Sequence, residues 1–404
     1  MNKIPTKKSG FNPNWQIKTL NEVCDKISAG VDKPNDCTTE KTEENQIPIF
    51  SNGIKNKGLC GYTKTPTITK PALTISARGT IGFACVRYEP FFPIVRLICV
   101  IPNEKLVVLE FLCYALQYII PQGEGTSVPQ LTIPNFKKIE IPIPPLDEQK
   151  RIASALSKID AYLENTIKLI EEKERFKRGI AKKLLTCKEG ENIPEARFKG
   201  FEDEWEIVKL GDITKMISGG TPNTKIKEYY NGNIVWATIT DITNSYKYLY
   251  DSEKKITELG LQNSSTKIFP INTVLYSIYG SIGECAISKV ECTTNQAILG
   301  IECSDKINYN FLYYLLSNHK NNAKKLRQFG TQPNINKKIV LNFCFKIPNI
   351  EEQEKIGGYL SLLDAEIDNL KKQKELIKEM KRGAMQKLLS GEVRLSKNAF
   401  NENI

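Results

Sequence analysis

Two segments of the chain, residues 147–186 and 350–390, carry hydrophobic stripes with the spacing of long amphipathic helices. Apolar residues recur in them at steps of mostly three and four, the heptad pattern of helices that pair with one another. The first stripe weakens where charges cluster at 171–175. We predict two long helices, whose pairing residues are Ile152, Leu156, Ile159, Leu163, Ile356, Leu360, Leu363, Ile367 and Leu370.

A helix of about 40 residues is about 60 Å long, much longer than a domain core requires. Two such helices in one chain can bury each other's stripes as an antiparallel pair, or coiled coil. That pairing would place the segments before each helix at opposite ends and relate them by an approximate two-fold axis. Two alternatives remain open: each helix folds back on its own globule, or pairs with another chain.

The residues before each long helix are typical of short strands separated by Gly, Pro and Asn turns, as at 47–50, 83–86 and 273–276. Each half also contains one helical stretch, beginning near Leu109 and near Phe311. We therefore expect an α+β fold with two mixed α/β globules. The predicted boundaries are 12–146 for the first globule, 147–186 for the first helix, 187–200 for a linker, 201–349 for the second globule and 350–390 for the second helix.

The sequence contains an internal duplication. Trp15 and Trp205 open the two copies, and SARGTIG at 76–82 matches SIYGSIG at 277–283. EQKRIASALSKID at 148–160 matches EQEKIGGYLSLLD at 352–364, and the offset of 204 stays constant to LL at 184–185 and 388–389. A repeat of this length makes each unit a whole domain. Because loops accept insertions, the constant offset indicates that helix length is constrained, although descent of both copies from one duplication is an alternative explanation.

Composition restricts the class of protein. A length of 404 residues with 40% hydrophobic and 25% charged residues indicates a folded protein of two or three domains. The formal charge of +11 favours a polyanionic partner, although a biased genome composition would give the same excess. Eleven cysteines without a C-x-x-C pair predict free, mostly buried thiols in a reducing cytoplasm. No signal peptide or membrane span is expected.

The chain lacks the residues that common enzyme sites need. His319 is the only histidine, in a polar stretch where an exposed surface residue is expected. There is no zinc-spaced cysteine pair, no phosphate-binding G-x-x-x-x-G-K-[ST] loop and no G-x-G-x-x-G dinucleotide motif. The N/D-P-P-F/Y tetrapeptide of adenine amino-methyltransferases is also missing. We expect a binding protein without catalytic residues, metal ligands or a cofactor of its own.

The run GTSVPQLTIPNFKKIEIPIPPLDEQKRIASALSKID at 125–160, echoed at 330–367, strongly resembles the specificity subunits of type I restriction-modification enzymes. The resemblance covers nearly the whole chain. It implies two target-recognition domains that each read one half of a bipartite double-stranded DNA site, and helices that fix their spacing. It also implies that two copies of a modification subunit dock here, bind S-adenosylmethionine and methylate adenine, and that motor-nuclease (restriction) subunits join the complex.

The residues that contact DNA are predicted from loops. The glycines at 79–82 and 280–283 can present backbone N–H groups to phosphate, with Arg78 as a charge or a guanine reader. Polar groups after Gly125 and Gly330 suit phosphate or adenine, and the lysines that follow supply salt-sensitive attraction. The candidates are Arg78, Gly79, Thr80, Thr126, Ser127, Gln130, Lys137, Lys138, Gly280, Ser281, Thr331, Gln332, Asn334, Lys337 and Lys338. Tight turns and solvated lysines are the alternative interpretations.

Two other functions are compatible with the composition, namely a stand-alone DNA-binding regulator and a helical adaptor whose globules bind proteins. Neither explains the paired repeat. The two globules differ greatly in sequence, so we expect an asymmetric target with two unlike halves.

Overall fold

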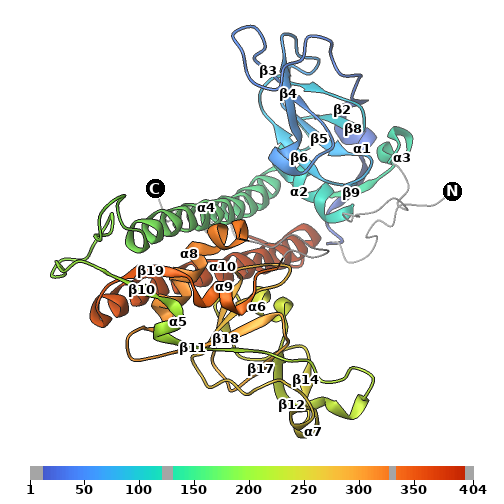
Figure 1. Cartoon of the computed structure of the whole chain (residues 1–404). Coiled ribbons are helices and arrows are strands. Elements are labelled where there is room, and N and C mark those ends of the chain that lie inside the picture. The colour runs from blue at the N-terminus through green and yellow to red at the C-terminus, as the bar shows by residue number, and fades with distance from the viewer. Residues whose placement is uncertain (1–11, 121–130, 327–333, 396–404) are drawn as a thin grey trace. The chain divides into compact units, whose positions relative to one another are not determined.

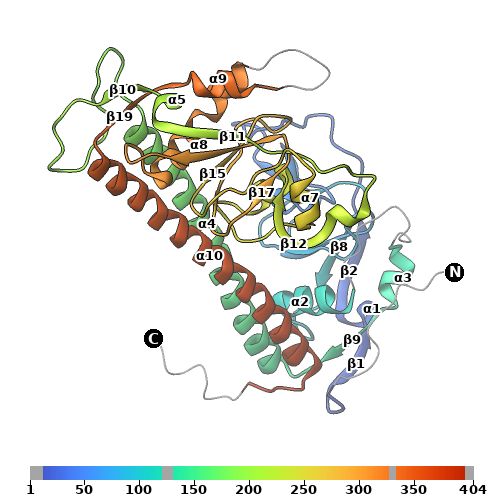
Figure 2. The same ribbon diagram turned by 60° about the horizontal axis from the view of Figure 1, so that its bottom comes forward.

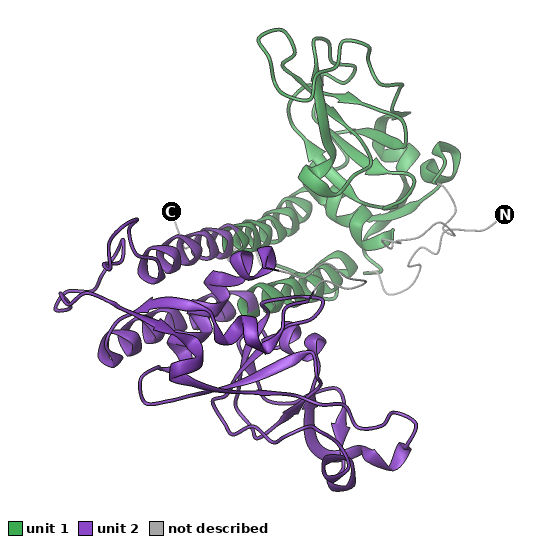
Figure 3. Cartoon of the chain, in the orientation of Figure 1, with its two compact units in different colours: residues 1–167, 372–404 green, residues 168–371 purple. Residues whose placement is uncertain are grey.

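The computed structural model describes residues 12–120, 131–326 and 334–395 (Figure 1). They form two compact units (Figure 3). The first unit contains residues 1–167 and 372–404, and the second contains residues 168–371. Both boundaries fall inside the long helices, so each unit holds half of each helix.

The first unit is built on the antiparallel sheet β2-β8-β5-β6, in which Ser76 at the end of β5 lies opposite Leu97 of β8. A smaller sheet, β4-β3-β7, and a ribbon, β1-β9, complete it. Its elements are β1 (Gln16–Thr19), α1 (Leu20–Val23), β2 (Cys24–Ala29), β3 (Ile47–Phe50), η1 (Lys55–Gly58), β4 (Leu59–Thr63), β5 (Ala72–Ser76), β6 (Ala84–Arg87), β7 (Phe92–Pro93), β8 (Leu97–Pro102), α2 (Leu109–Ile119), α3 (Ile133–Lys137) and β9 (Glu140–Ile143).

The second unit repeats this plan with an addition. The sheet β11-β18-β15-β16 corresponds to β2-β8-β5-β6 and gains the edge strand β13, parallel to β16. The sheet β14-β12-β17 and the ribbon β10-β19 complete the unit. Its elements are β10 (Glu206–Lys209), α5 (Leu210–Ile213), β11 (Thr214–Ser218), η2 (Lys227–Tyr229), β12 (Tyr230–Ala237), α6 (Ile239–Asn244), β13 (Tyr248–Leu249), β14 (Lys255–Ile256), α7 (Glu258–Gln262), β15 (Val274–Ser277), β16 (Cys285–Ser288), β17 (Thr293–Thr294), β18 (Ile298–Cys303), α8 (Tyr309–Lys325), α9 (Lys337–Leu341) and β19 (Cys344–Ile347).

The two long helices are α4 (Leu146–Leu185) and α10 (Ile350–Ser390), within one residue of the prediction. They pack antiparallel, side by side in Figure 2. In the second unit Lys177 of α4 contacts Asp364, and Glu174 pairs with Lys371 at 2.8 Å. The predicted α+β class, with two α/β globules and an antiparallel helix pair, is confirmed.

Each stripe has two functions. Ile152 and Leu156 are buried in the core of the first unit, together with Phe111 of α2 and with Leu388 and Leu389 of α10. The corresponding part of α10 packs in the same way into the core of the second unit. Each helix therefore packs on its own globule and on the other helix, so two arrangements that the sequence left as alternatives occur together.

A buried glutamine fastens each long helix to its globule. Gln149 accepts a hydrogen bond from the Val108 backbone N–H at 2.8 Å and donates to the carbonyls of Leu106 and Pro144. Gln353 makes the same three bonds at the start of α10, where it accepts from Asn308. Because the side-chain amide uses both its acceptor and its donors, its burial leaves no polar group unsatisfied. Both copies of the repeat keep this glutamine because it anchors the helix to its globule.

The thiols differ in part from the prediction. All eleven cysteines are free, but only Cys99, Cys113, Cys285 and Cys292 are buried. Burial raises the pKa of each of these four thiols to about 12. Among the described residues, no helix is long and apolar enough to cross a membrane.

Candidate nucleic-acid interface

The predicted loop of the first unit is a tight turn held by a single asparagine. Gly79 and Gly82 have φ values of 78° and 82°, in the left-handed region that glycine tolerates. The Asn52 side chain donates to the Arg78 carbonyl at 2.8 Å, and the Thr80 hydroxyl donates to the Asn52 carbonyl at 2.9 Å. The side chain of Arg78 is exposed. The loop is therefore both a tight turn and an ordered platform for an arginine.

The two glycines of this loop have different reasons to be glycine. A Cβ atom on Gly82 would approach Ile120 to 2.8 Å, so Gly82 lets the loop pack against the end of α2. A Cβ on Gly79 would meet nothing nearer than 3.5 Å. Only Gly79 is therefore in a position to be approached by a ligand.

The second unit carries the same loop with different side chains. Gly280 and Gly283 have φ values of 60° and 84°, and Gly283 packs against Lys320 as Gly82 packs against Ile120. The Ser281 carbonyl accepts a hydrogen bond from the Ser277 hydroxyl. Tyr279 stands where the first unit has Arg78 and is 37% exposed. The two loops thus share a backbone but offer different chemistry.

The other polar candidates lie partly beside these loops. Asn334 forms an antiparallel bridge with Tyr279, and the Leu131 N–H donates to the Ala77 carbonyl. The chain at Leu131 and at Asn334, shortly after Gly125 and Gly330 in the sequence, therefore lies at the edge of its unit that carries the loop. Five candidates lie outside the described residues, namely Thr126, Ser127, Gln130, Thr331 and Gln332.

The four candidate lysines lie on two short helices that follow the segments at the loop edge. Lys137 and Lys138 are at the end of α3, which packs on α1 and β2. Lys337 and Lys338 begin α9, which packs on α5 and β11, and both are exposed. In the second unit α9 therefore begins close to the loop, because Asn334, three residues before Lys337, bridges to the loop residue Tyr279.

The predicted pairing residues are mostly buried. Ile152 and Leu156 lie in the first core, and Ile356, Leu360 and Leu363 in the second. Ile367 is buried, whereas Ile159, Leu163 and Leu370 are half-buried.

Polar groups that the stripes do not reveal connect the helices to the globules. In the first unit the Tyr114 hydroxyl donates to Asp160 at 2.8 Å, and Lys381 of α10 pairs with the same carboxylate at 2.6 Å. In the second unit Tyr314 donates to Asp364, which Lys177 of α4 also contacts. Each helix thus provides the aspartate of one cluster and the lysine of the other. Burial is the main cause that raises the pKa of both tyrosines, so they stay protonated donors.

A buried carboxylate begins each long helix. Glu352 accepts two hydrogen bonds from Arg197, at 2.9 and 2.7 Å, and one from the Trp205 indole N–H at 3.3 Å. Glu148 is held in the same bidentate manner by Arg394, with both bonds at 2.8 Å. Each arginine comes from the segment after a long helix, so these pairs fasten the chain's return to its globule.

The second unit contains a buried cation that has no counterpart in the described part of the first. Lys247 is 6% exposed, and its ammonium donates to the hydroxyls of Tyr314 at 3.0 Å and Ser361 at 2.6 Å. The ammonium also lies 4.7 Å from the centre of the Tyr248 ring. Burial lowers the pKa of Lys247 to about 8, and Asp364 partly opposes that shift.

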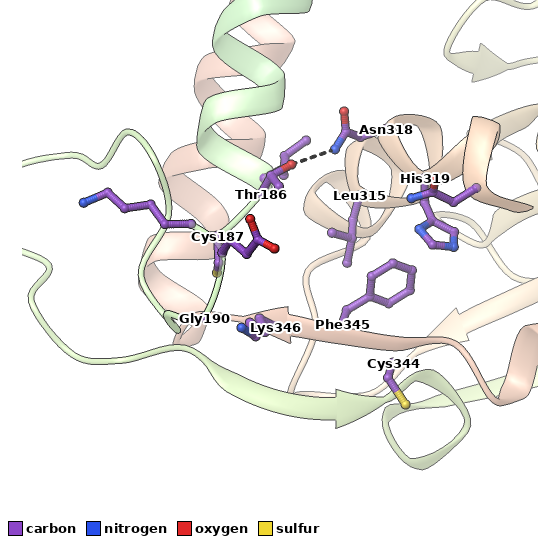
Figure 4. Close-up of a pocket in the computed structure, with 13 residues that line it drawn as sticks. Thr186, Cys187, Gly190, Leu315, Asn318, His319, Cys344, Phe345 and Lys346 are labelled. Carbon is purple, nitrogen blue, oxygen red and sulfur yellow. Dashed lines mark hydrogen bonds between the residues drawn. The ribbon is translucent and has the colours of Figure 1, made fainter.

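A cleft of about 370 Å³ lies in the second unit between the end of α4, α8 and β19 (Figure 4). Asn318 crosses it to the Thr186 hydroxyl at 3.4 Å. His319, expected on the surface, is instead half-buried, with its ring centroid 5.0 Å from that of Phe343 and 5.1 Å from that of Phe345. Burial lowers its pKa. Among the described residues, no group of His, Cys, Asp and Glu side chains is placed to bind a metal ion.

Comparison with known proteins gives a consistent result. Residues 12–172 and 202–379 match the family model of the type I restriction modification DNA specificity domain. The MjaVIII specificity subunit of Methanocaldococcus jannaschii is 29% identical over 323 residues, which cover 74% of this chain and 73% of that protein. The EcoR124I/EcoR124II specificity subunit of Escherichia coli is 28% identical over 278 residues, 65% of each chain. The MjaIX specificity subunit of M. jannaschii is 37% identical, but over 44% of this chain and 42% of that protein.

The fold also agrees with a solved structure. The crystal structure of the type I restriction-modification S subunit from M. genitalium matches with a TM-score of 0.62 and 19% identity, over 96% of this chain and 99% of that one. At this identity the likeness supports the fold. Since the family model covers most of both repeats, the chain belongs to the type I restriction-modification DNA specificity subunits, the non-catalytic components that give these enzymes their DNA specificity.

Proposed function

We propose that this chain recognises an asymmetric DNA site of two unlike halves, one read by each globule, and that it docks two copies of an adenine methyltransferase subunit. The observation that carries the proposal is the family match over both repeats together with loops of equal backbone and unequal side chains. Equal backbones place both loops against DNA in the same way. Unequal side chains then read different bases.

The helix pair acts as the spacer. Because α4 and α10 are anchored to their globules by Gln149, Gln353 and the two Glu–Arg pairs, a movement of a globule against its helix would break buried hydrogen bonds. A rigid spacer fixes the distance between half-sites on the DNA. It also raises the effective concentration at which the second globule meets DNA once the first is bound.

The division of labour follows the boundaries expected from the sequence. Residues 12–146 and 201–349 act as the recognition domains, 147–186 and 350–390 as spacer helices and 187–200 as a linker. The described loop residues that we expect at DNA are Arg78, Gly79, Thr80, Gly280, Ser281 and Asn334. Lys137, Lys138, Lys337 and Lys338 add sequence-independent attraction. S-adenosylmethionine binds the methyltransferase partner in the cytoplasm, and restriction subunits join the same complex.

The test is a selection of DNA from a random duplex library, by the chain alone and by the chain reconstituted with an adenine methyltransferase subunit from the same genome. The proposal predicts that the complex enriches a gapped motif with two unlike halves, and that the chain alone binds more weakly. A stand-alone regulator would enrich its site equally well without the partner. A protein-binding adaptor would enrich nothing and would show no salt-dependent affinity for DNA.

A further inference from the structure

A second exposed arginine of the first unit stands beside the Arg78 loop. Arg96 lies in the turn between β7 and β8, and its carbonyl accepts a hydrogen bond from the Ala77 N–H at 2.9 Å. Its side chain is exposed. Among the described residues, no ion pair involves Arg78 or Arg96.

The backbone of Arg96 is unusual for an arginine. Its φ is +75°, in the left-handed region, at the third position of a turn closed by the Leu97 N–H and the Ile94 carbonyl at 3.3 Å. Glycine or asparagine normally occupies such a position, because a Cβ atom is strained there. At the matching turn of the second unit, Ala297 has no positive φ. The shared fold therefore does not require the strain.

The turn is held rigidly. The Val95 N–H donates to the Val31 carbonyl at 2.8 Å, and the Ile94 N–H donates to the Phe50 carbonyl at 2.9 Å. With the bond from Ala77, the turn is connected to three neighbouring segments. A rigid backbone lowers the entropy that the arginine loses when it binds. Arg87 of the same unit provides a contrast, since its guanidinium lies 3.5 Å from the centre of the Phe50 ring and serves the fold.

The surroundings of Arg96 suit the edge of a base pair. Val31 and Val95 flank the turn and are 46% and 45% exposed. Exposed valines near a guanidinium that has no ion pair in the described part of the chain offer an apolar contact for a thymine methyl group and a bidentate donor for guanine O6 and N7. A surface that contacted phosphates alone would have no use for the valines.

We propose that Arg96 is a specificity-determining residue of the first recognition domain and reads a guanine in the major groove. This inference rests on the proposed function, because it requires that the first unit bind DNA. The strained turn is kept because it aims the guanidinium at the base, and the cost of the strain is borne by the fold.

The decisive variant is Arg96→Gly, since glycine relieves the backbone strain while it removes the guanidinium. In the library selection we expect the preference for guanine at one position of one half-site to fall roughly 10- to 100-fold, with the other half-site unchanged. The melting temperature of the chain should stay equal or rise by about 2 °C. Arg96→Lys keeps the charge but loses the two parallel N–H donors of the guanidinium. Its preference for guanine should lie between those of Arg96→Gly and the wild type. Lys105→Gln, which removes an exposed charge elsewhere on the unit, is the control.

Three results would overturn the inference. They are an unchanged motif with Arg96→Gly, an equal loss of affinity for all sequences with a shallower salt dependence, and a lower melting temperature, which would make Arg96 a structural residue. Failure of the proposed function is distinguishable, because the wild-type complex itself would then enrich no two-part motif.

Discussion

The two units share a scaffold and differ in how well water is excluded from the side chains that fasten each globule to the long helices. In both, a glutamine, a Glu–Arg pair and a Tyr–Asp–Lys cluster fasten the globule to the helices. In the second unit Arg197 is 13% exposed and the Trp205 N–H also binds Glu352. In the first unit Arg394 is 56% exposed, and the Trp15 indole N–H has no partner among the described residues. The comparison teaches that the repeat preserved the anchors, while the protection of each anchor from water diverged.

The largest effect is expected from the buried ion pairs. Arg197→Met leaves Glu352 buried without its cation and should lower the free energy of unfolding of the second unit by about 3 kcal/mol. Arg394→Met should cost the first unit about 1 kcal/mol, because water reaches that pair more easily. Hydrogen exchange measured on peptides of each unit separates the two effects. Equal losses would show that the difference in exposure has no energetic consequence.

The stability of the second unit should depend on pH through Lys247. The pKa of Lys247 falls from 10.5 in the unfolded chain to about 8 in the fold, so the charged form is penalised at low pH. The penalty is fully present below pH 8 and is relieved as pH rises from about 8 to 10.5, where only the unfolded chain keeps the proton. We expect this group to raise the free energy of unfolding by roughly 1–2 kcal/mol at pH 9.5 relative to pH 7.

The matched control for this pH effect is Lys247→Met, in which other titrating thiols and phenols are unchanged. Urea unfolding at pH 7 and 9.5 should show the gain in the wild type and its loss in the variant. A variant that keeps the full gain would assign the effect to other groups.

The two Tyr–Asp–Lys clusters should respond unequally to loss of their lysine. Lys381→Met leaves Asp160 with Tyr114 as its remaining partner and should cost about 1.5 kcal/mol. Lys177→Met should cost about 0.5 kcal/mol, because Lys247 still stabilises the charge of Asp364. Thermal unfolding of the two variants measures the difference, and the reverse order would contradict the stabilising role of Lys247.

The smallest effect is expected at the surface. Lys57 pairs with Glu164 at 2.8 Å, but the two side chains are 66% and 53% exposed. Water and salt screen such a pair, so Lys57→Ala should change the free energy of unfolding by less than about 0.5 kcal/mol. A loss above 1 kcal/mol in urea unfolding would show that this pair is part of the anchoring system.

The sequence revealed the periodic features and missed the long-range ones. The helices were predictable because their stripes extend over many turns, and the domain pair because it is repeated. Arg197, Arg394 and Lys247 were not, since their partners lie more than 100 residues away along the chain, at Glu352, Glu148 and Ser361. The start of the second long helix also depends on a distant partner. The Asn349 side chain accepts a hydrogen bond from the Glu352 N–H, but the Glu352 carboxylate binds Arg197 and does not complete a capping box.

At the candidate interface, glycine spacing located the loops but not the chemistry around them. Arg96 escaped notice because no local pattern marks a left-handed turn that lacks glycine. Asn52, which orders the Arg78 loop, lies 26 residues before Arg78 in the chain. Sites assembled from separate loops on one sheet edge are visible only once the strands are paired.

We propose that this chain decides where adenine is methylated. This proposal is tested most directly by genome-wide mapping of methylated adenine, by single-molecule sequencing, in cells with and without the gene. We expect that deletion abolishes methylation at one gapped motif with two unlike halves, and that restoring the gene restores it. Unchanged methylation, with the chain and its methyltransferase both shown to be expressed, would contradict it.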